Sequence, residues 1–319
     1  MTKSKRILSV ILAIILFFSI LKSEGILSED SLEGNLEVHF IDVGQGDAIL
    51  VKSDEEFMLI DAGKNVDGDL VVNYLKGQNV KKLKYVIGTH PHEDHIGGLD
   101  NVIDVFDVEK VIMPNVIHTT KTFEDVLDSI INKGLKITPA KSGDKYYLGE
   151  SEVLILAPNK MEYENLNNYS VVTKLMYGNT SFIFTGDAEN ISEMEMIEVY
   201  EDKLKSNVLK VGHHGSITST SQEFLDAVRP EDAVISLGKG NTYGHPHKEI
   251  IDRLKANNII IHRTDLEGTI VAKSDGNNII FQGESPLRQK IFVLLNEINN
   301  IKDILLEEIN NNQYEREIF

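Results

Sequence analysis

Three histidines and one aspartate stand close together in the segment His90-Pro-His92-Glu-Asp94-His95. The segment follows the apolar stretch 85–89, which is expected to be a buried strand. Imidazole and carboxylate are the usual protein ligands of Zn²⁺ and similar cations. His90 and His92 alternate, so an extended chain points both to one side, whereas Asp94 and His95 follow a turn and can face a second ion. The spacing therefore predicts a transition-metal centre.

Further candidate residues stand where other apolar stretches end. His213 follows the predicted strand 208–211, which is where a ligand is expected. Its neighbour His214 points elsewhere and is expected to support the ligands. Asp187 also follows an apolar stretch, and by position alone it equally suits the cap of a helix at 189–202.

Several motifs accompany the histidine cluster in a fixed order. They are Phe40-Ile-Asp-Val-Gly-Gln-Gly-Asp47, Leu59-Ile-Asp-Ala-Gly63, Thr89–Gly98, Thr185-Gly-Asp187, Leu209-Lys-Val-Gly-His-His-Gly-Ser216 and Asn241-Thr-Tyr-Gly-His-Pro246. With them the chain resembles the metallo-β-lactamase superfamily over residues 36–282. Within that superfamily it is most similar to the extracellular hydrolase domain of the ComEC competence family. The resemblance implies an α/β fold, a four-layer αββα sandwich, and metal-dependent hydrolysis.

The resemblance also implies roles for particular residues. It makes Asp187 the carboxylate that bridges two metals, and it places Asp61 under the site, where it accepts a hydrogen bond from a ligand imidazole. One histidine of the usual superfamily pattern is missing, because Asn-Asn-Tyr-Ser stands at 167–170 and His118 lies in a polar loop. ComEC-like proteins and bacterial phosphorylcholine esterases share this departure. We expect His213 to fill the gap as a ligand, or else to act as a proton donor or substrate contact.

Two divalent transition-metal ions, Zn²⁺ or Mn²⁺, are therefore expected to share Asp187. One ion is assigned His90, His92 and His213, and the other Asp94, His95 and His245, with His247 as the alternative to His245. Each set leaves room for solvent, which is the open arrangement of a catalytic site rather than a structural one.

The expected chemistry is hydrolysis by an activated water molecule. Two cations about 3.5–4 Å apart can activate water between them, so no serine or cysteine nucleophile is required. Catalysis is assigned to Asp94, Asp187 and His213. Substrate contacts are expected from Ser216, Asn168, Asn241 and Tyr243, and Lys210 and Lys239 could neutralise a phosphate.

A phosphate-bearing substrate, either DNA or an envelope polymer, suits this chemistry best. A carboxylic ester or lactone is one alternative, and a non-catalytic accessory that guides DNA during uptake is another. The chain has 50 acidic and 32 basic residues, a net charge of −18, and such a field repels polyanions and disfavours simple DNA binding. The absence of cysteine excludes disulfides, thiolate zinc sites and a catalytic thiol.

Many short apolar stretches alternate with helical patterns, which predicts a mixed α/β fold with two sheets and helices outside. Strands are expected at 37–42, 48–52, 57–61, 85–89, 111–113, 152–157, 170–177, 181–185, 208–211, 233–237, 259–261, 269–273 and 278–281. Helices are expected at 67–76, 98–106, 123–133, 189–202, 221–228 and 248–257.

The two ends of the chain differ from this domain, which is expected to span 36–283. Residues 7–21 form an apolar run after a basic start, which is typical of a signal sequence or signal anchor. We expect an uncleaved single-pass anchor at 1–24 and a linker at 25–35, with the domain outside the cell membrane, or a secreted domain if the segment is cleaved. Heptad spacing at 284–319 predicts a helix that packs on the domain, self-associates or binds a partner.

Overall fold

The computed structural model describes residues 35–283. The predicted anchor at 1–24, nearly all of the linker at 25–35 and the C-terminal helix at 284–319 lie outside this range, so those predictions stay open. Within the described range, no helix combines the length and the apolarity needed to cross a bilayer.

The first sheet has eight strands within residues 35–283, in the order β15-β14-β1-β2-β3-β4-β5-β6. Their bounds are β1 Leu36–Phe40, β2 Ile49–Ser53, β3 Glu56–Ile60, β4 Lys82–Ile87, β5 Asp107–Met113, β6 Ile137–Pro139, β14 Ile270–Ser274 and β15 Ile279–Gly283. Strands β3 to β6 are parallel to one another. The ends of β3 and β4 therefore meet at one edge, and they deliver Asp61 and the histidine cluster there.

The second sheet has seven strands in the described chain, in the order β13-β12-β11-β10-β9-β8-β7. Their bounds are β7 Lys145–Leu148, β8 Ser151–Ala157, β9 Val172–Tyr177, β10 Thr180–Phe184, β11 Val208–Lys210, β12 Asp232–Ile235 and β13 Ile260–Arg263. Strands β10 to β13 are parallel. Asp187 follows β10 and the two adjacent histidines follow β11, so these residues reach a common edge as well.

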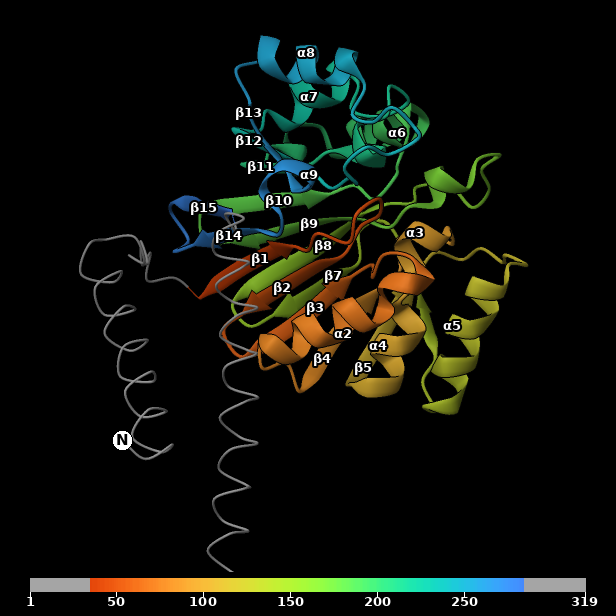
Figure 1. Ribbon diagram of the computed structural model, residues 1–319. Coiled ribbons are helices and arrows are strands. Elements are labelled where there is room, and N and C mark those ends of the chain that lie inside the picture. The colour runs from red at the N-terminus through yellow and green to blue at the C-terminus, as the bar shows by residue number, and fades with distance from the viewer. Residues whose placement is uncertain (1–34, 284–319) are drawn as a thin grey trace, which may run out of the picture. The chain divides into compact units, whose positions relative to one another are not determined.

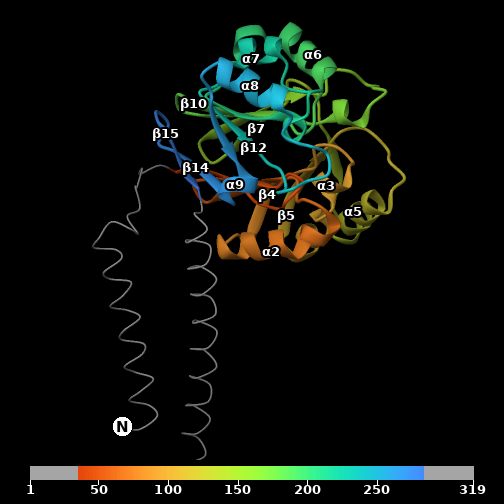
Figure 2. The same ribbon diagram turned by 45° about the horizontal axis from the view of Figure 1, so that its top comes forward.

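Helices cover the outer faces of both sheets, as Figures 1 and 2 show. The helices of the first half are α2 Gly68–Gly77, α3 Glu93–Ile96, α4 Leu99–Val105 and α5 Lys121–Asn132. Those of the second half are α6 Asn190–Tyr200, α7 Gln222–Val228, α8 Lys248–Ala256 and α9 Thr264–Glu267. Separate apolar clusters fill the space under each helical layer and the space between the sheets. This arrangement is the predicted sandwich of two sheets with helices outside.

Most element bounds agree with the expected ranges to within a few residues, and local chemistry explains where helices start. The Thr120 hydroxyl accepts a hydrogen bond from the Phe123 amide and caps α5, and Ser221 caps α7 in the same way. Strands β6 and β7 were not expected. They are short, and they lie at the sheet edges, where they bury little apolar surface and leave a weak pattern.

Candidate metal centre

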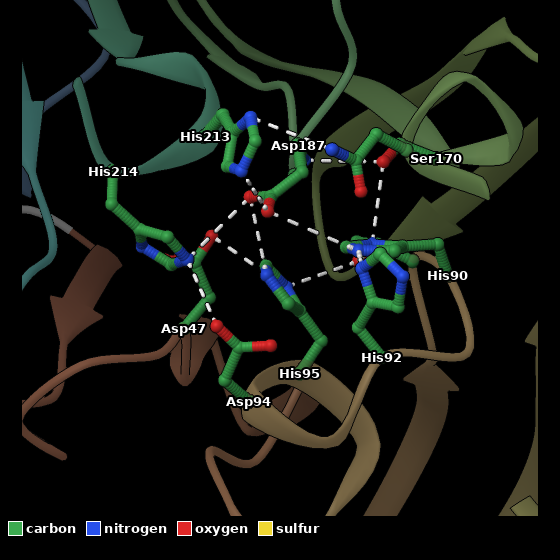
Figure 3. Close-up of polar contacts among 12 residues, drawn as sticks. Asp47, His90, His92, Asp94, His95, Ser170, Asp187, His213 and His214 are labelled. Atoms are coloured by element: carbon green, nitrogen blue, oxygen red, sulfur yellow. Dashed lines mark hydrogen bonds and ion pairs between the residues drawn. The ribbon is translucent and has the colours of Figure 1, made fainter. Parts of the chain in front are cut away.

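The carboxylate of Asp187 lies at the centre of a cluster of imidazoles (Figure 3). Its Oδ1 is 3.1 Å from His95 Nε2 and 3.6 Å from His214 Nε2. Its Oδ2 is 3.6 Å from His213 Nε2 and 3.9 Å from His90 Nε2. Each oxygen thus faces its own pair of imidazoles, which is the arrangement that a carboxylate shared by two cations requires.

The contacts around each oxygen have the spacing of metal ligands. Bonds of about 2.0–2.2 Å in a tetrahedral zinc site place neighbouring ligand atoms about 3.4 Å apart. On the Oδ2 side, His90 Nε2 lies 3.0 Å from His92 Nδ1. On the Oδ1 side, His214 Nε2 lies 3.5 Å from Asp94 Oδ2. Asp94, His95 and His214 therefore form one candidate cation site, and His90 and Asp187 belong to a second, which His95 also adjoins.

Buried polar atoms without partners converge on the same space. Asp187 Oδ1, His95 Nε2 and His214 Nε2 are all buried, and ion-pair contacts of 3.1 and 3.6 Å join them without a hydrogen bond. An unpartnered buried polar atom costs about 1–3 kcal/mol, so three of them in one place need an explanation. A cation between them removes this cost, and nitrogen and carboxylate donors suit Zn²⁺ or Mn²⁺.

The electrostatics of the cluster also favour positive charge. Burial alone would lower the pKa of His95, yet the charges of Asp187 and Asp61 raise it well above its usual value. For Asp187, burial works in the opposite direction, and the positive charges of His95 and His214 hold its pKa well below its usual range. Burial and the charge of His95 lower the pKa of His90 well below its usual value, so His90 is a neutral imidazole that can donate a lone pair.

Asp61 lies beneath the cluster, in the supporting position that was expected for it. Its carboxylate is completely buried and accepts hydrogen bonds from the Thr89 amide and hydroxyl and from His95 Nδ1, at 2.8, 2.7 and 2.8 Å. Since Nδ1 of His95 donates to Asp61, its Nε2 is left free to bind a metal.

An unusual turn carries His213 and His214. Both have left-handed backbone angles, with φ of 49° and 55°, and Gly215 follows with φ of 84°. Left-handed residues other than glycine cost about 1 kcal/mol or more each, and such strain gathers at functional sites. The turn directs both rings toward Asp187, although neighbours in a strand would point apart.

This turn changes the role predicted for His214. We expected it to support the ligands, but its ring is buried, and its Nδ1 donates to the Ser236 carbonyl at 2.9 Å. With Nδ1 bound in this way, its Nε2 faces Asp94 Oδ2 at 3.5 Å and Asp187 Oδ1 at 3.6 Å. The geometry places His214, rather than His245, in the second ligand set.

His245 instead lines the pocket beside the cluster. Its ring stacks on Tyr243 at a centroid distance of 5.7 Å, and the groups of potential metal ligands within residues 35–283 leave out His92, His213 and His245 alike. Burial first, and then the charges of His213 and His214, lower its pKa to about 4. The alternative ligand, His247, accepts a hydrogen bond from the Ile217 amide through Nδ1.

The stretch that lacks the usual superfamily histidine lies next to His213. Asn167 Nδ2 is 3.4 Å from His213 Nδ1, and the Ser170 hydroxyl accepts a hydrogen bond from the Asp187 amide at 3.1 Å. The ring of His213 thus occupies the side of the site where the missing ligand was expected. His118 is hydrogen-bonded to the Thr120 hydroxyl in the loop before α5.

A pocket of about 430 Å³ opens over the cluster. It is lined by Gln45, Lys64, His92, Glu93, Asp94, Asp187, His213, His214, Tyr243 and His245. Of the four predicted substrate contacts, only Tyr243 is among them. Gln45, Lys64 and Glu93 were not singled out from the sequence, although they lie within or directly after the quoted motifs.

The other predicted contacts use their polar atoms inside the protein. Asn168 accepts a hydrogen bond from the Glu189 amide, and the Ser216 hydroxyl is hydrogen-bonded to the Thr218 hydroxyl. The Asn241 side chain donates to the His245 carbonyl and accepts from the His245 amide. The prediction that Lys210 neutralises a phosphate is wrong. Its side chain is completely buried and bound to Asp47, so no substrate can reach it.

Comparison with known proteins places the fold in a family. The model of the metallo-beta-lactamase superfamily matches residues 41–239. The chain belongs to the metallo-beta-lactamase superfamily. In this superfamily context, the histidine and aspartate clusters indicate a metal-dependent hydrolase that binds divalent ions.

Two relatives match about three quarters of this chain. ComE operon protein 3 of Bacillus subtilis is 33% identical and covers 73% of this chain, which in turn covers 32% of that protein. Competence protein ComA of Neisseria gonorrhoeae is 28% identical, covering 75% of this chain and 32% of that protein. The chain is thus a ComEC-like protein that spans about a third of the length of these relatives.

A solved structure shows the same fold at low identity. The diiron beta-hydroxylase CmlA of Streptomyces venezuelae aligns with a TM-score of 0.51 at 13% identity, over 73% of this chain and 53% of that one. At this identity the likeness concerns the fold alone.

Proposed function

We propose that the chain is a dinuclear metallohydrolase of phosphodiesters, a phosphodiesterase or nuclease that acts outside the cell membrane. The observation that carries the proposal is the placement of Asp187, whose two oxygens face separate pairs of imidazoles. One cation would be held by His90, His92 and His213, and the other by Asp94, His95 and His214, with Asp187 shared.

The residues of the chain prepare this centre for hydrolysis. When bound, two divalent cations stabilise charge on an attacked phosphoryl group and lower the pKa of a water molecule. Asp61 holds His95, and the Ser236 carbonyl holds His214, so that Nε2 of each ring stays directed inward. The Ser170 hydroxyl holds the Asp187 backbone. Loss of such a supporting contact commonly lowers metal affinity by about 10–100-fold.

The pocket is suited to an anionic group. Lys64 is the lysine among its lining residues, and the carboxylates of Asp94 and Asp187 would be neutralised by the cations. Tyr243 is 62% exposed at the same pocket and can contact a flat or apolar part of a substrate. The competence names of the relatives support DNA as the phosphodiester.

A substrate screen tests the proposal. The metal-loaded chain should cleave bis-p-nitrophenyl phosphate and single-stranded DNA, and a chelator should abolish both activities. Cleavage of a lactone or carboxylic ester with no phosphodiester activity would contradict the substrate class. DNA binding without turnover in any divalent metal would support the accessory role instead.

Lys64→Met is expected to weaken binding of anionic substrates. A hydrogen bond to a charged group contributes about 1.5–3 kcal/mol, so KM for a phosphodiester should rise roughly ten-fold or more, with little change in kcat. Steady-state kinetics measure this. Lys239→Met is the matched control, since Lys239 is exposed and is not among the residues that line the pocket. Equal effects of the two substitutions would remove Lys64 from the substrate site.

We further propose that residues 7–21 anchor the chain in the membrane with the catalytic domain outside, and that 284–319 form a separate helical extension. Protease added to intact, wall-stripped cells should then degrade the domain at once. Protection until the cells are lysed would contradict this topology.

A further inference from the structure

A buried ion pair lies behind the imidazoles of the metal centre. Lys210 Nζ is 2.9 Å from Asp47 Oδ2, and the two side chains are 0% and 2% exposed. Burying two charges carries a desolvation penalty that their attraction often fails to offset, so such a pair is a poor source of stability. Neither residue lines the pocket, and Asp47 adjoins the centre only on its far side, next to Asp61 and His95.

The pair connects backbone segments from both sheets. The Asp47 amide donates to the Asp94 carbonyl at 3.0 Å, and the Asp47 carbonyl accepts from the Gly63 amide at 2.8 Å. Lys210 Nζ also donates to the Val211 carbonyl at 3.0 Å, just before the turn that carries the two adjacent histidines. The ion pair therefore joins the histidine cluster of the first sheet to the histidine turn of the second.

Asp47 faces the Nδ1 atoms of two imidazoles whose Nε2 atoms face Asp187. Its Oδ1 is 3.5 Å from His214 Nδ1, and its Oδ2 is 4.0 Å from His95 Nδ1 (Figure 3). Asp47 Oδ1 is buried and has no hydrogen-bond partner. At 3.5 Å it falls just short of a hydrogen bond with His214, whose Nδ1 donates to the Ser236 carbonyl instead.

We propose that the Asp47–Lys210 pair is a positioning device for the cation held by Asp94, His95 and His214. By joining Asp47, whose amide donates to the Asp94 carbonyl, to the strand end just before the histidine turn, the pair holds His214 in place against Asp94 and His95. Loss of either partner breaks this link, so the turn that carries His214 would no longer be held at the distance from Asp94 that the cation requires. The inference rests on the proposed two-cation centre.

The chain contains a matched control for this proposal. Lys174 is a second buried lysine, and its Nζ donates to the carbonyls of Lys203 and Lys205 at 2.7 and 2.6 Å. It lies on β9 of the same sheet and contacts no candidate ligand. Lys174→Met thus removes a buried ammonium without touching the metal centre.

Zinc binding to metal-free protein should be measured by calorimetry, together with unfolding in urea in the presence of chelator. Lys210→Met and the isosteric Asp47→Asn should each lower the affinity for one of the two zinc ions by about 10–100-fold. The affinity for the other ion should stay unchanged. Lys174→Met should lower stability but keep wild-type affinity for both ions.

The double variant Lys210→Met with Asp47→Leu separates positioning from charge balance. It should regain the stability that Lys210→Met loses, because no charge is left buried alone, but it should not regain zinc affinity. Recovery of both properties would overturn the proposal, as would wild-type affinity in both single variants. A wild-type chain that binds fewer than two ions would instead overturn the proposed function, and this inference with it.

Discussion

Asp187→Asn is expected to reduce kcat/KM for a phosphodiester by about 10⁴-fold, the scale seen when one member of a catalytic unit is removed. The reason is that one substitution takes a charged ligand from both cations at once, since the two oxygens of Asp187 face different imidazole pairs. Both metal affinities should fall together. Kinetics at saturating metal, combined with elemental analysis after dialysis, measure the two effects.

Asp232→Asn is the matched control for that variant. Asp232 is a half-buried carboxylate 3.0 Å from His262 Nε2, at the start of β12, whereas the candidate ligands lie beyond the ends of the neighbouring strands. Its activity should stay within about two-fold of wild type, which is the scale of a surface contact. An Asp187→Asn enzyme that keeps activity within ten-fold of wild type would show that Asp187 is not a shared ligand.

The second large effect concerns the two neighbouring histidines. His213→Ala should lose the ion held with His90 and His92, and His214→Ala should lose the ion held with Asp94 and His95. If either ring were only a proton donor, turnover would fall by roughly 10²–10⁴ while both ions stayed bound. Metal analysis of each folded variant therefore separates a ligand from a proton donor.

Two other histidines serve as controls in the same experiment. His118→Ala and His245→Ala should both retain two ions, because His118 is hydrogen-bonded to Thr120 and Asp94 is paired with His214 rather than with His245. If His245→Ala loses an ion while His214→Ala keeps both, the assignment from the sequence stands and the one from the geometry is wrong. If His118→Ala loses an ion, the usual superfamily pattern applies here as well.

Local patterns were sufficient to predict the sandwich and the cluster at His90–His95. The ligand types of the cluster are adjacent in the chain, and the strands other than β6 and β7 stand out as apolar runs. His214 could not be placed in this way. Its direction depends on two successive left-handed residues, and no periodicity predicts that a histidine pair will adopt them.

The environment of Lys210, a charged residue, could not be predicted from local sequence patterns either. At the end of a short strand it was expected to reach a phosphate, yet β11 lies between β10 and β12 and is covered on both faces. A lysine there must be buried and must find an acidic partner. The partner, Asp47, comes from a loop of the other sheet, and only the tertiary fold brings the two together.

The most direct test of the account is the number of metal ions that the chain binds. Metal-free protein reconstituted with Zn²⁺ or Mn²⁺ and freed of excess ions should contain two ions per chain by elemental analysis. Binding should also raise the unfolding temperature, since a ligand at 1,000 times its Kd stabilises the native state by about 4 kcal/mol. Two ions per chain, lost together in Asp187→Asn, is the predicted result. Saturation at one ion per chain would contradict the dinuclear centre.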